Sequence, residues 1–148
     1  MVDITERKKM NELLNKLNPD TIPGWGTLTA QRMIEHLTTQ VNYSNGNLVS
    51  YLDVDPIEAE KLKRSRVLSD FMLPQNAKGP DIPTKLEYPS LMSAIDALNR
   101  ALDDFENYFL TEGRTIIHGG FGPMNRKEWI IWHGKHFTHH FRQFGLIG

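Results

Sequence analysis

The chain has 148 residues, of which 39% are hydrophobic and 24% charged, which is enough for one hydrophobic core and too little for two. We therefore expect a single domain over residues 1–148. Seventeen basic and eighteen acidic side chains leave a net charge of -1, and neither sign gathers into a stripe that could follow a phosphate backbone. This balance argues against nucleic acid as a partner.

Two absences bear on compartment and chemistry. The first residues lack the apolar segment of a signal peptide, and no run approaches the roughly 20 apolar residues that span a bilayer. We therefore expect a soluble, cytoplasmic protein that does not engage a membrane. The chain also lacks cysteine, so a thiol that takes part in its chemistry has to arrive with a substrate.

Apolar residues at helical spacing predict two helices in the first third of the chain. Asp3 and Glu6 have the spacing of a capping box, and the pattern that follows stops at about residue 18. A turn rich in proline and glycine leads to a second helix, which begins after Thr27 or Thr29 and runs to about Asn47. This second helix carries a single histidine, His36, beside its apolar stripe.

Between residues 48 and 89 the pattern is weaker. Asp55 and Pro56 predict the start of a lesser helix that runs to about residue 73. Its middle, residues 61–66, is strongly basic, which is typical of a solvated helix face but also of an anion-binding patch for an acidic substrate. Four prolines then break any periodicity over residues 74–89, so this stretch is either a lid or a plain surface loop.

The rest of the chain predicts two more principal helices. Strict 3–4 spacing of apolar residues covers residues 90–113, and a glycine-rich loop with His118 follows over residues 115–123. Asn125 and Glu128 then form a capping box before the last helix. Because no segment alternates convincingly as a strand would, we predict an all-α four-helix bundle with an extra helix and loop inserted between the second and third helices.

A cluster of histidines on the last helix is the most informative feature. His136 and His140 are four residues apart, so they differ by roughly 40° around the helix axis and about 6 Å along it and can face one point. His36, on the second helix, can supply a third ligand from a facing element of the bundle. Three imidazoles leave positions open for water or substrate, as in catalytic zinc sites. We predict that these three residues bind a divalent metal, although a hydrogen-bonded core network or an accident of composition could produce the same histidine-rich helix.

The other histidines are weaker candidates. His133 is either a catalytic group that faces substrate or a packed polar residue, and His118 is either an acid–base group at the bundle mouth or part of the loop. His139 points roughly 100° away from its neighbour His140, so we expect it to be exposed to solvent. No glutamate follows His136, because Phe137 occupies that position, and the zincin pattern is therefore absent.

Three motifs, taken together, resemble one known group of proteins. Residues 136–143 (HFTHHFRQ) resemble the terminal-helix signature of the DinB/YfiT-like superfamily of four-helix-bundle metalloproteins. Residues 25–26 (WG), followed by residues 33–37 (MIEHL), resemble its second-helix motif, and residues 118–122 (HGGFG) are similar to the loop of an uncharacterised branch. That branch usually has proline after the loop histidine, where this chain has Gly119.

The resemblance implies both ligands and chemistry. Carried over by position, it implies that His36, His136 and His140 bind zinc, nickel or a related divalent metal. It also implies a metal-dependent transferase or isomerase that uses a low-molecular-weight thiol, or water, against a small electrophilic substrate. A non-catalytic metal or small-ligand binding protein of stress response is the alternative, and a scaffold that has lost its metal is a third. Bundles of this kind often dimerise, so a homodimer is among the expected assemblies.

Overall fold

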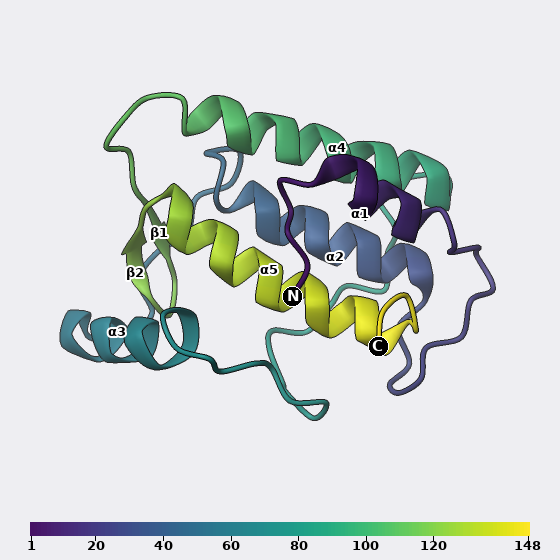
Figure 1. Ribbon diagram of the computed structural model, residues 1–148, viewed down its shortest axis with the longest axis horizontal. Helices are drawn as coiled ribbons and strands as arrows, with labels where there is room; N and C mark the ends of the chain where they lie inside the picture. The colour runs from purple at the N-terminus through teal and green to yellow at the C-terminus, as the bar shows by residue number, and fades with distance from the viewer.

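Five α-helices and one antiparallel pair of strands form the regular structure of the computed structural model, which describes residues 1–148. In Figure 1, four of the helices lie alongside one another, while α3 and the strands lie together at one end of them. The elements are α1 (Arg7–Leu14), α2 (Ala30–Asn42), α3 (Pro56–Leu62), a single π turn η1 (Lys63–Val67), α4 (Leu91–Tyr108), β1 (Ile116–His118), β2 (Gly122–Met124) and α5 (Arg126–Gln143).

The predicted all-α four-helix bundle is wrong, because the glycine-rich stretch forms a small sheet. Strands β1 and β2 pair with Ile116 opposite Met124 and His118 opposite Gly122. Each strand has only three residues, and a period-2 pattern needs about four to eight residues to be recognised. Gly122, with φ of 74°, is also a residue that predicts a turn rather than a strand.

Local side-chain contacts explain where the helices begin. The Thr29 side chain accepts a hydrogen bond from the backbone of Arg32 at the start of α2. The predicted capping box of α5 is confirmed, since Asn125 and Glu128 each accept a hydrogen bond from the other's backbone N–H. The predicted capping box at Asp3 is wrong: its carboxylate accepts from Thr5 and α1 begins only at Arg7.

The helix in the insertion after α2 is shorter than the sequence pattern predicts. The helix expected to reach about residue 73 ends at Leu62, and η1 carries it only as far as Val67. Lys135 from α5 accounts for this end, because its ammonium group donates to the carbonyl oxygens of Arg66 (2.9 Å) and Ser69 (2.7 Å). A cation at the carbonyl end of a helix satisfies groups that have no partner within it.

One cluster of 24 buried hydrophobic side chains lies between the helices. Its largest fully buried members include Trp129, Phe137 and Phe141 from α5, and α2 contributes Met33 and Leu37. Burial of an aromatic or aliphatic side chain of this size stabilises the fold by about 1.5–3 kcal/mol. The same faces of α2 and α5 that pack into this core determine how the histidines on those helices meet.

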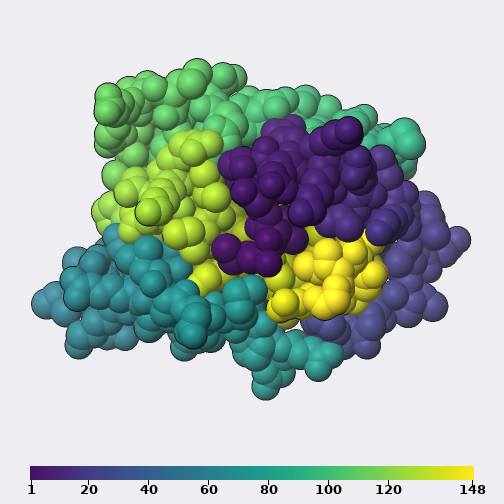
Figure 2. Space-filling model, in the orientation of Figure 1, coloured from purple at the N-terminus to yellow at the C-terminus, as the bar shows by residue number.

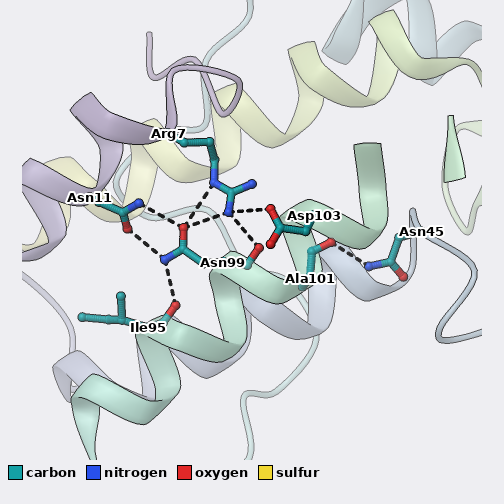
Figure 3. Close-up of polar contacts among 7 residues, drawn as sticks. All are labelled: Arg7, Asn11, Asn45, Ile95, Asn99, Ala101 and Asp103. Carbon is teal, nitrogen blue, oxygen red and sulfur yellow. Dashed lines mark hydrogen bonds and ion pairs between the residues drawn. The ribbon is translucent and has the colours of Figure 1, made fainter. Parts of the chain in front are cut away.

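Polar contacts fix the N-terminal part of the chain to the other helices. Figure 3 shows that Arg7 donates to the Asn99 carbonyl oxygen at 2.8 Å and pairs with Asp103 at 3.0 Å, while Asn11 and Asn99 exchange hydrogen bonds between their amides. The residues before α1 cross α5, where Val2 N–H donates to the Thr138 hydroxyl at 2.7 Å. In Figure 2 this purple segment lies against the yellow C-terminal residues. None of the helices has the length and apolar character that crossing a membrane requires.

Candidate metal centre

Three histidines from two helices meet at one point of the structure. His36 comes from α2, and His136 and His140 lie one turn apart on α5. The Nε2 atom of His136 is 3.0 Å from that of His36 and 3.2 Å from that of His140, and one ring nitrogen from each of the three lies within 4.8 Å of the others. We call these residues the histidine triad.

The donor set of the histidine triad fits a divalent metal. Nitrogen ligands about 2.1 Å from one zinc ion lie about 3.0–3.4 Å apart when the angle between them is that of an octahedral or tetrahedral site. The two short distances, 3.0 and 3.2 Å, fall in this range. Nitrogen lone pairs this close repel each other unless a proton or a cation lies between them. The triad can therefore hold a divalent ion of the kind that imidazole ligands suit.

Burial keeps the triad in the form that binds metal. Loss of solvent lowers the pKa of His36 to about 4 and that of His140 to about 3, and it takes the pKa of His136 well below 6.5. The neighbouring imidazoles lower these pKa values further, because each disfavours a second positive charge nearby. At neutral pH all three rings are uncharged, and only an uncharged imidazole has a lone pair to offer a metal.

A cavity of about 480 Å³ adjoins the triad at His36. One wall is formed by Glu35 and Thr39 of α2 together with Tyr43 just after it, and the other wall is formed by residues 80–83 and 85–88. Its lining combines hydrophobic side chains with polar ones, as in sites that hold a small molecule by burial and a few hydrogen bonds.

The far wall of this cavity is tied to α2 by hydrogen bonds from side chains to backbone. Arg32 donates to the carbonyl oxygens of Ile82 (2.8 Å) and Pro83 (3.1 Å). Gln31 donates to the Tyr88 carbonyl at 2.7 Å, and the Glu35 carboxylate accepts from the backbone N–H of Glu87 at 2.6 Å. Part of the proline-rich stretch, predicted as a lid or a surface loop, is therefore a wall held beside His36.

The structure places His133 in the core rather than at the triad. Its side chain is buried, its Nε2 lies 2.7 Å from the Ser44 hydroxyl, and its ring stacks on Trp129 with centroids 5.2 Å apart. Nδ1 has no hydrogen-bond partner, and burial lowers the pKa of His133 to about 3. These contacts are those of a packed polar residue.

His118 and His139 also occupy positions distinct from the triad. His118 accepts a hydrogen bond from Gly120 N–H at 3.0 Å and stacks on Phe121 with centroids 4.2 Å apart, so it belongs to the sheet region. His139 is partly buried rather than fully exposed, and its ring lies edge-on to Trp25 with centroids 5.8 Å apart. Trp25 thus borders the His139 side of α5, close to the triad.

The basic run of residues 61–66 is largely engaged within the protein. Lys63 pairs with Glu128 at 3.3 Å, and Arg64 pairs with Glu60 at 3.2 Å. The guanidinium of Arg66 lies 4.4 Å from the centre of the Phe71 ring. These contacts favour the solvated helix face over an anion-binding patch.

Sequence reasoning missed the roles of two side chains that belong to α5, Gln143 and Lys135. Gln143 contacts His140, and its position three residues further along the helix is a signal that could have identified it. Lys135 holds the end of η1, and nothing in the local pattern predicts its partners because they lie more than 60 residues away.

No family model matches the chain, and neither a curated protein nor a solved structure does. Membership of the DinB/YfiT-like superfamily therefore stays a prediction from three motifs. The geometry of the histidine triad stands independently of that resemblance.

Proposed function

We propose that the protein is a metal-dependent enzyme in which the histidine triad holds a divalent metal, with zinc or nickel as the expected ions. The observation that carries the proposal is the convergence of three neutral imidazoles with neighbouring Nε2 atoms 3.0 and 3.2 Å apart. A divalent ion bound there lowers the pKa of a coordinated water or thiol and so supplies a nucleophile at neutral pH. The substrates are a small electrophile and either water or a small thiol that the chain, without cysteine, does not supply itself.

The residues around the triad define what the protein itself contributes. Imidazole ligands carry no charge, so they leave the full positive charge of the ion available to polarise a substrate. The cavity beside His36 offers a space of about 480 Å³ for that substrate. His133 and His118 are engaged elsewhere, which leaves His139 as the remaining histidine near the triad.

The resemblance to the DinB/YfiT-like superfamily supports the thiol-dependent transferase or isomerase form of the proposal. A non-catalytic metal-binding protein of stress response is the alternative, and turnover distinguishes the two. Dimerisation through a helix face is a further prediction from the same resemblance, to be measured by light scattering.

The test begins with metal-free protein reconstituted with Zn²⁺ or Ni²⁺ near pH 7.5. We expect one equivalent of bound metal, and turnover in a panel that pairs small thiols with electrophiles or that reports hydrolysis. His136→Ala is the matched negative control, because it removes the ligand that both other imidazoles face. Metal content well below one equivalent would reject the metal centre, whereas full loading without any turnover would favour the non-catalytic alternative.

A further inference from the structure

The last residue of α5, Gln143, connects the histidine triad to a distant turn of the chain. Its side chain is buried, with a relative exposure of 5%. One end of its amide lies 2.8 Å from His140 Nδ1, and the other end donates from Nε2 to the Trp25 carbonyl oxygen at 3.1 Å. Trp25 precedes Gln143 by 118 residues, and in Figure 1 the chain between α1 and α2 passes close to the C-terminal end of α5.

The direction of these hydrogen bonds follows from which atoms can donate. A backbone carbonyl only accepts, so the NH₂ end of the Gln143 amide faces Trp25 and the oxygen end faces His140. An amide oxygen cannot donate, so His140 Nδ1 carries the proton in this contact. In a neutral imidazole the other nitrogen is then unprotonated, and that nitrogen, Nε2, is the one 3.2 Å from His136.

The turn that contains Trp25 also contacts Gln143 through its two glycines. Gly24 N–H donates to the Gln143 carbonyl oxygen at 2.7 Å, which holds the turn on the end of α5. Gly26 has a φ of 75°, in the left-handed region that favours glycine. A Cβ atom at Gly26 would also lie only 3.0 Å from the Gln143 Nε2 atom. Both glycines of this turn thus lie against Gln143.

We infer that Gln143 is a positioning residue of the metal centre, and that the Trp25 carbonyl fixes its amide so that His140 presents an unprotonated Nε2 to the ion. This inference rests on the proposed metal-binding function. Hydrogen bonds to the second nitrogen of a histidine ligand set its tautomer and its ring orientation, and their loss costs about 10–100-fold in metal affinity. We call this series of contacts, from Trp25 through Gln143 to His140, the relay.

The test compares Gln143→Leu with Gln143→Glu and with Thr138→Val. Leucine keeps the volume but removes both polar ends, whereas glutamate keeps the acceptor that faces His140. Thr138 lies on the same helix between two triad members and bonds to Val2 and Gly134 instead, so its valine variant controls for a general loosening of α5. Affinity for Zn²⁺ is measured by chelator competition, and the His140 tautomer in metal-free protein by ¹⁵N NMR.

We expect wild-type protein to show the Nδ1–H tautomer at His140. Gln143→Leu should lose this preference and bind Zn²⁺ about 10–100-fold more weakly. Gln143→Glu keeps the acceptor but loses the donor to Trp25, so it should retain the tautomer and bind Zn²⁺ more weakly than wild type, and Thr138→Val should stay within about threefold of wild type. Affinity within threefold of wild type and an unchanged tautomer in Gln143→Leu would overturn the inference.

Two further outcomes remain informative. If Gln143→Leu does not fold, the test passes to Gly26→Ala, whose Cβ would displace the amide from Trp25. That variant should weaken Zn²⁺ binding and broaden the ¹⁵N NMR signals of the His140 ring. An unchanged affinity together with unchanged signals would overturn the inference. If wild-type protein binds no Zn²⁺, the proposed function fails, while the NMR measurement on metal-free protein still decides whether the relay sets the tautomer.

Discussion

Five buried or partly buried histidines should make the stability of the metal-free protein depend steeply on pH. Burial lowers the pKa of His36 and of His118 to about 4. It lowers the pKa of His133 and of His140 to about 3, and it takes the pKa of His136 well below 6.5. In the unfolded chain each imidazole regains a pKa near 6.5.

The sign and size of the effect follow from the protons that each state binds. Between the folded and unfolded pKa values the unfolded chain binds more protons, so the free energy of unfolding falls as the pH falls through that interval. Each histidine contributes about 1.4 kcal/mol per pH unit to this slope where it is protonated only in the unfolded chain. Five histidines together contribute about 7 kcal/mol per pH unit. Since small domains are stable by about 5–15 kcal/mol, we expect the metal-free protein to unfold near pH 5.

Urea titrations at pH 7, 6, 5.5 and 5, with a chelator present, measure this slope by linear extrapolation. The variant His133→Gln removes one of the five groups and should reduce the slope by about 1.4 kcal/mol per pH unit, whatever it does to the stability at pH 7. A wild-type slope below about 1.4 kcal/mol per pH unit near pH 5 would mean that fewer than one histidine gains a proton on unfolding. That result would refute the burial of uncharged histidines.

Three mutational predictions address the triad and the packing around α5. Alanine at any position of the histidine triad should abolish stoichiometric metal binding while His139→Ala leaves it nearly intact; equal losses in elemental analysis would reject this ligand set. Gly134→Ala should lower the free energy of unfolding by about 1–3 kcal/mol, because overpacking costs this much and its Cβ would lie 2.7 Å from the Val2 carbonyl oxygen; an unchanged urea midpoint would contradict that contact. Lys135→Met should speed amide hydrogen exchange over residues 63–70, since two hydrogen bonds from its ammonium group are lost; unchanged exchange would show that another contact holds η1.

The helices could be predicted from the sequence because their signals are local. Apolar spacing of three and four residues marks α2, α4 and α5, and Asn125 marks the start of α5 by a contact with a residue three positions away. The two strands could not be predicted, since three-residue strands with glycine and proline are indistinguishable from a turn. The hydrogen bond from the Trp129 ring to the Ile116 carbonyl oxygen joins β1 to α5, a contact that local sequence pattern does not show.

The candidate site, like the fold, could be predicted from the sequence only in part. The sequence by itself determined that His136 and His140 share one face of α5, because residues four apart on a helix are neighbours whatever surrounds them. Only the tertiary structure decided that His36 lies 3.0 Å from His136, that the Gln143 amide bridges His140 and the Trp25 carbonyl, and that burial lowers the pKa of these histidines. The contacts of His36 with His136 and of Gln143 with Trp25 join residues 100 or more positions apart, and they arise from the packing of whole helices around a shared core, which no local spacing records.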